Sequence, residues 1–81
     1  MKNKAAADRF QSELNRAIAL HQQNRLAEAE PIYRQLLRID PSHFDAVHLL
    51  GTLLRRTGNL AESMALLDRA VAMRPQSAAA Q

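Results

Sequence analysis

The chain has 81 residues, of which 47% are apolar and 23% are charged, and its formal net charge is +3. These values are ordinary for one small globular domain and exclude a wholly disordered chain or a collagen-like fibre. No apolar run approaches the roughly 18 residues that a membrane span needs. The absence of cysteine excludes a disulfide framework, a thiolate zinc site and a cysteine nucleophile.

Most of the excess positive charge lies in the first nine residues, where Lys2, Lys4 and Arg9 face a single acid, Asp8. The rest of the chain is close to neutral. A nucleic-acid surface would need basic residues clustered on one face of that body, so we expect no nucleic-acid partner and no membrane partner. The N-terminus has no apolar stretch of signal-peptide length, and we expect a cytoplasmic protein.

Taken in chain order, the sequence predicts four helices and no strand. Residues 1–9 form a lead-in, and Ala5, Ala6 and Ala7 favour a first helix that starts as early as Lys4 with Asn3 as its cap. The predicted helices then cover about Phe10–Gln23, Leu26–Ile39, Phe44–Thr57 and Leu60–Met73.

Short breaks separate these helices. Asn24 and Gly58 divide the two members of each pair, and both residue types end helices readily in the left-handed conformation. Pro41 and Pro75 follow the second member of each pair and disfavour helix at the residue before them. Connections this short predict antiparallel neighbours and hence an all-α fold.

The chain repeats itself at a spacing of 34 residues, which lays 10–43 on 44–77. Identical residues fall at the expected helix ends and packing positions: Phe10/Phe44, Leu20/Leu54, Leu26/Leu60, Ala27/Ala61, Glu28/Glu62 and Pro41/Pro75. Small residues also recur at equivalent places, Ala17 with Gly51 and Ala29 with Ser63. We expect Gly51 to lie where two helices of one unit approach closely.

A paired-helix unit of this length, with a small residue in each helix and a closing proline, resembles the tetratricopeptide repeat. The matching residues in the first unit are Ala17, Leu20, Ala29, Tyr33, Leu36 and Pro41. Those in the second are Val47, Leu50, Gly51, Leu54, Ser63, Leu67, Ala70 and Pro75. The resemblance implies a solenoid fragment within one domain, 1–81, with repeats at 10–43 and 44–77 and the start of a third at 78–81.

Three positions depart from a regular pattern. Glu13 and Arg16 replace the large apolar residues of the family motif, as a terminal helix with one open side would. Pro31 lies about one turn into the second helix, which predicts either a late start near Glu28 or a slight bend.

The resemblance implies that the first helix of each unit lines a concave groove. The predicted helix 44–57 is apolar nearly all round, and its polar residues form one narrow stripe at helical spacing. We therefore assign the groove to that stripe and to the equivalent line of the first helix: Gln11, Leu14, Ile18, His21, Gln22, Asp45, His48, Thr52, Arg55 and Arg56.

No enzyme, cofactor or metal site is predicted. The serines and histidines lie in no nucleophile elbow, and no glycine-rich loop is present for phosphate. A metal would need His43, Asp45 and His48, and no second pair supports them. Arg55 and Arg56 have two possible roles. They are cations placed favourably at the negative end of a helix dipole, or they bind an acidic side chain or a terminal carboxylate of a partner.

The sequence thus favours a scaffold that binds a protein or peptide, with an acidic group as one candidate feature of the partner. Two alternatives stay open: a non-catalytic segment of a larger enzyme, such as the repeat arrays that precede glycosyltransferase domains, or a self-assembling structural unit. We also expect a homodimer through the C-terminal helix, where some of Leu66, Ala70 and Met73 would form an apolar patch.

Overall fold

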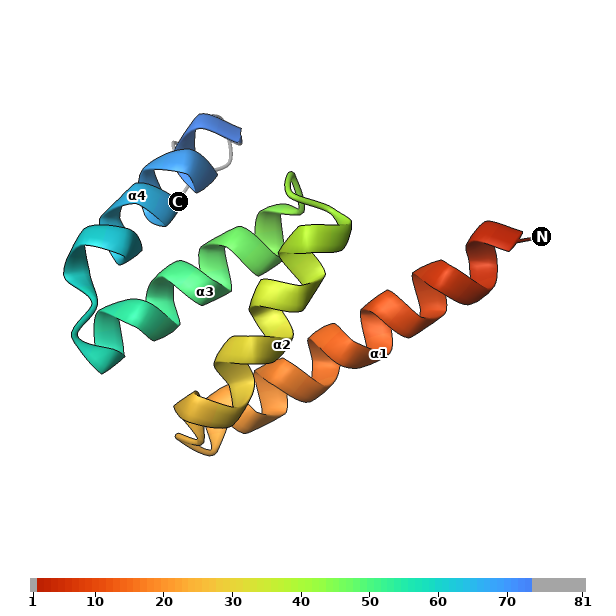
Figure 1. The fold of residues 1–81 in the computed structure, drawn as a ribbon, viewed down its shortest axis with the longest axis horizontal. Helices are drawn as coiled ribbons and strands as arrows, with labels where there is room; N and C mark the ends of the chain where they lie inside the picture. The colour runs from red at the N-terminus through yellow and green to blue at the C-terminus, as the bar shows by residue number, and fades with distance from the viewer. Residues whose placement is uncertain (1, 74–81) are drawn as a thin grey trace.

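The computed structural model describes residues 2–73, with side chains from residue 5 onward. It contains four α-helices: α1 (Lys2–Gln22), α2 (Leu26–Ile39), α3 (Phe44–Thr57) and α4 (Leu60–Met73). Figure 1 shows them as two successive helix pairs, with α1 at one edge and α4 at the other. Residues 2–73 contain no strand, which confirms the all-α prediction.

The turns inside the two pairs have the same construction. Asn24 (φ 63°) and Gly58 (φ 94°) both adopt the left-handed conformation that closes a helix. The next amide in each turn, that of Arg25 or Asn59, donates back to the carbonyl of Leu20 or Leu54 at 2.8 and 2.9 Å. The equivalence of Asn24 and Gly58, predicted from the sequence, is therefore confirmed in backbone geometry.

The turn between the pairs is held by side chains. The Nδ1 of His43 accepts a hydrogen bond from the Ala46 amide at 3.3 Å and caps α3. Its ring packs on Phe10 with centroids 4.7 Å apart. Arg69 of α4 donates to the carbonyl of Pro41. The loop is thereby attached to both α1 and α4.

The core consists of residues from facing helix surfaces, with α3 at its centre. Buried members are Leu14, Ala17, Ala29, Tyr33, Leu36, Ala46, Leu50, Leu53 and Leu54. A Cβ added to Gly51 would lie 2.9 Å from Leu67 Cδ2 and 3.3 Å from Leu66 Cβ. The predicted close approach of α3 and α4 at Gly51 is therefore confirmed. At the same place, the Ser63 hydroxyl of α4 donates a hydrogen bond to the Gly51 carbonyl of α3 at 2.7 Å.

One detail of the predicted helices is wrong. The first helix already includes Lys2, so Asn3 lies within it and does not cap it. The second begins at Leu26, as its predicted bounds have it, and carries Pro31 inside, so of the two effects expected from Pro31 the late start near Glu28 does not occur. A proline there removes one backbone hydrogen bond, which the packing of Ala29, Tyr33 and Leu36 outweighs. The repeat boundaries stay a prediction, and the proposed third repeat at 78–81 lies outside the described residues.

Candidate binding groove

The groove residues predicted on α1 fall into two groups. Gln11 and Gln22 are exposed, and Ile18 is partly buried. Leu14 and His21 are buried instead, at 1% and 8% exposure. These two side chains are part of the packed interior, so they are not available to a partner in this conformation. Asn15, which accepts a hydrogen bond from Gln11 at 3.0 Å, was missed and is exposed between Gln11 and Ile18.

His21 forms a buried polar pair with Tyr33. Its Nδ1 lies 3.0 Å from the Tyr33 hydroxyl, and the rings meet edge to face. Burial raises the pKa of Tyr33 to about 12, so its hydroxyl keeps the proton at neutral pH. Burial, and after it the positive charge of Arg56, lowers the pKa of His21. A neutral His21 that accepts the Tyr33 O–H satisfies both groups.

The groove residues predicted on α3 lie outside the core. Asp45, His48, Arg55 and Arg56 are exposed, and Thr52 is partly buried with its hydroxyl donating to the His48 carbonyl at 3.0 Å. The His48 ring stacks on Phe44 with centroids 5.7 Å apart. The helix is therefore packed on most sides and polar along one line, as the sequence predicted.

Arg56 connects the two units. Its guanidinium donates to Asn24 Oδ1 at 2.8 Å, so the end of α3 is tied to the turn between α1 and α2. This contact holds a cation close enough to His21 to contribute to its lowered pKa. The sequence offers no signal for the contact, because its two partners are separated by 32 residues.

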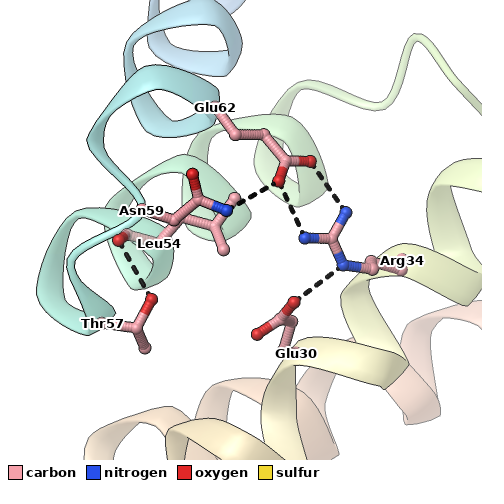
Figure 2. A network of polar contacts seen from close by, with 6 residues as sticks. All are labelled: Glu30, Arg34, Leu54, Thr57, Asn59 and Glu62. Atoms are coloured by element: carbon pink, nitrogen blue, oxygen red, sulfur yellow. Dashed lines mark hydrogen bonds and ion pairs between the residues drawn. The ribbon is translucent and has the colours of Figure 1, made fainter.

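A second inter-unit contact joins α2 to α4 (Figure 2). Arg34 donates through both terminal nitrogens to the Glu62 carboxylate, at 2.8 and 3.0 Å, and through Nε to Glu30 at 2.9 Å. The side-chain amide of Asn59 donates a further hydrogen bond to Glu62 Oε1 at 3.2 Å. The hydrogen bonds from Arg34 hold the pKa of Glu62 below its usual value. Glu30 and Arg34 are four residues apart, the spacing of an ion pair within one helix, whereas no spacing in the sequence indicates the bridge to α4.

An apolar hollow, also missed, lies between α1 and α2. It has a volume of about 580 Å³, and Ile39, which is 63% exposed, stands at its rim. Its lining consists of Ala6, Arg9, Phe10, Glu13, Pro31, Ile32, Gln35, Leu36 and Ile39. The spacing of Pro31, Gln35 and Ile39 places them on one side of α2, which is the signal that could have revealed it.

The exposed apolar surface of α4 differs from the predicted one. Leu60, Met64 and Val71 are the exposed large residues there. Ala70 is buried and Leu66 is partly buried, because both face α3. Leu60, Met64, Leu67 and Val71 are spaced four, three and four residues apart and form one line along the helix.

The helical-repeat fold agrees with an independent comparison of the sequence. A family model described as the tetratricopeptide repeat matches residues 4–43 and 14–78. The chain belongs to the tetratricopeptide repeat family. Comparisons with curated proteins and with solved structures found no match.

Tetratricopeptide repeats are non-catalytic modules that generally mediate protein–protein interaction. Among residues 2–73, no helix has the length and apolar character to cross a membrane. The same residues contain no group of three or more potential metal ligands. His43 instead uses its Nδ1 to cap α3.

Proposed function

We propose that this tetratricopeptide module binds a protein segment through the surface formed by α1 and α3. The observation that carries the proposal is a line of exposed or partly buried side chains that lie outside the fully buried core. On α1 it consists of Gln11, Asn15, Ile18 and Gln22, and on α3 of Asp45, Thr52 and Arg56. Amide, hydroxyl and charged groups on rigid helices suit the recognition of an extended polar segment.

The two ends of this surface carry opposite charges. Its guanidinium is held by Asn24 at one end of the line, while Asp45 lies at the other end of α3. An acidic side chain or a terminal carboxylate would bind the arginine end with charge-assisted hydrogen bonds. A held guanidinium loses less side-chain entropy on binding than a free one. This favours Arg56 as the anchor over Arg55, which has no such tether among residues 2–73.

The test is selection of binders from a displayed random-peptide library with free carboxyl termini, against the intact chain. We expect selected peptides to carry an acidic group near one end. Their affinity should fall about tenfold or more with Arg56→Glu, since a charge-assisted contact becomes repulsive.

The matched control is Arg38→Glu, which changes the same charge at an exposed position on α2. Binders that are equally sensitive to both variants, or to neither, would contradict the proposed groove. A cytoplasmic location is part of the same proposal and would be checked by imaging the tagged chain in its native cell.

A further inference from the structure

The two units indicate which side chains of a unit the next unit in a stack would cover, because the second repeats the first at 34 residues. In the first unit, Tyr33 is buried and Leu26 and Leu37 are partly buried. Their equivalents in the second unit are Leu60, Leu67 and Val71. Leu60 and Val71 are 58% and 53% exposed. Among residues 2–73, nothing covers the side of α4 that faces away from the first unit, and this side is thus an uncovered packing surface.

Two charges border this surface, and the first unit shows which way each one faces. The equivalent of Asp68 is Arg34, the side chain that reaches from the first unit to the second. The equivalent of Arg55 is His21, which is buried at 8% exposure. The side chains of Asp68 and Arg55 are exposed and have no hydrogen-bond or ion-pair partner among the described residues. We call Leu60, Met64, Leu67 and Val71, with Arg55 and Asp68, the C-terminal end face.

The opposite end of the molecule cannot serve as the complement of this face. On α3, the helix that follows the first unit, Val47 and Leu50 are buried at 0% and 1% exposure. Their equivalents on α1 are Glu13 and Arg16, which lie 3.6 Å apart with side chains 45% and 67% exposed. A head-to-tail stack of copies would bury this hydrated pair at the centre of an apolar contact, at a large desolvation cost.

We propose that the C-terminal end face binds the same face of a second copy, around a two-fold axis. A two-fold contact requires a self-complementary surface, in which each residue and its partner exchange roles between copies. The C-terminal end face has this property: an apolar line along α4 with a cation on one border and an anion on the other. Arg55 of each copy pairs with Asp68 of its partner, and Met64 and Leu67 lie between these two contacts.

Charge-swap variants test whether a second copy binds the C-terminal end face and whether it binds around a two-fold axis. The measurement is analytical ultracentrifugation of the 81-residue chain up to about 1 mM. Arg55→Asp alone and Asp68→Arg alone each turn two attractive contacts repulsive. Each should raise the dimer dissociation constant about tenfold or more. An equimolar mixture of the two single variants should recover the native dissociation constant as a heterodimer. In that heterodimer the introduced aspartate of one copy meets the introduced arginine of the other, and the native Asp68 meets the native Arg55.

The apolar line has a matched control elsewhere on the molecule. Met64 and Ile39 are 64% and 63% exposed, so Met64→Lys and Ile39→Lys add the same charge at equally exposed sites. Met64→Lys should abolish the dimer, whereas Ile39→Lys should leave it unchanged. Circular dichroism confirms that every variant keeps its helices.

Three results would overturn the proposal. The native chain could remain monomeric throughout the concentration range, which would leave the face to a different occupant. The dimer could respond to Ile39→Lys and not to Met64→Lys, which would move the contact to the first unit. The mixture of single charge variants could fail to associate, which would exclude the two-fold arrangement. None of these results bears on peptide binding at Arg56, so the groove proposal is judged separately.

Discussion

The two units share a backbone but differ in what their equivalent positions do. Arg16 and Leu50 occupy the same place in the repeat, yet the first is exposed and the second is 1% exposed. The reverse holds on the other side, where Tyr33 is buried and its equivalent Leu67 is only partly covered. The repeat therefore specifies helix geometry, whereas the residue chosen at each position specifies whether a neighbour packs there.

The largest expected effect on stability comes from giving one unit the residue that the other unit carries at the equivalent position. Leu50→Arg would place a guanidinium in the core without a partner and should reduce the free energy of unfolding by at least about 3 kcal/mol. Arg16→Leu should change it by no more than about 0.5 kcal/mol, since that position is open to water. Urea unfolding measures both. Similar losses for the two variants would show that the positions are not distinguished by their environment.

Substitutions at Gly51 and Arg55 compare the buried side of α3 with its exposed side. Gly51→Leu should destabilise by about 1–3 kcal/mol, because the Cβ alone would contact Leu66 and Leu67 too closely. Arg55→Ala, one turn further along, should leave stability nearly unchanged. Thermal melts at low protein concentration, where self-association is weak, give the ranking. The opposite ranking would mean that the two faces of α3 are exchanged.

The bridge between α2 and α4 is expected to contribute less. A double-mutant cycle with Arg34→Gln and Glu62→Gln should give a coupling free energy of about 0.5–1 kcal/mol, since both side chains are more than a third exposed and solvent screens them. The equivalent of Glu62 is Glu28, which pairs with Arg25 inside its own turn at 2.6 Å. The same cycle there should give about 0.2–0.5 kcal/mol. Equal couplings would indicate that the inter-unit bridge adds nothing beyond a local pair.

The smallest effect is a pH dependence specific to the first unit. Because the pKa of His21 is lower in the folded than in the unfolded chain, the unfolded chain binds the proton more tightly. The stability contributed by neutral His21 is complete above about pH 6.5, the unfolded value, and is lost as pH falls through the folded pKa. His21→Gln should remove this part of the decline in urea midpoints below pH 6.5. An unchanged decline in the variant would assign it to other groups.

The fold was predictable because local signals and the repeat agree. The bounds of α2, α3 and α4 match the helices expected from Asn24, Gly58 and Pro41. Helix periodicity alone identified the polar line of α3, since its neighbours Val47, Leu50 and Leu54 are strongly apolar.

The site was less predictable, because groove positions depend on which helix comes next. Leu14 and His48 are equivalent in the repeat, but Leu14 is buried in the core and His48 is exposed. His21 was expected on the surface and is instead paired with Tyr33, a residue 12 positions away on another helix. The bonds of Arg56 to Asn24 and of Arg34 to Glu62 likewise depend on how the pairs stack, which no spacing within one helix reveals.

The order in which the helices touch has a kinetic consequence. Each helix packs chiefly on the helix beside it in the chain, and α1 meets α3 only lightly. Contacts between near neighbours in sequence cost little loop-closure entropy, so assembly should occur within microseconds to milliseconds. In such a linear array, the outermost helix can open while the others remain folded. Amide protons of α4 should therefore exchange faster than those of α3, the helix with neighbours on both sides.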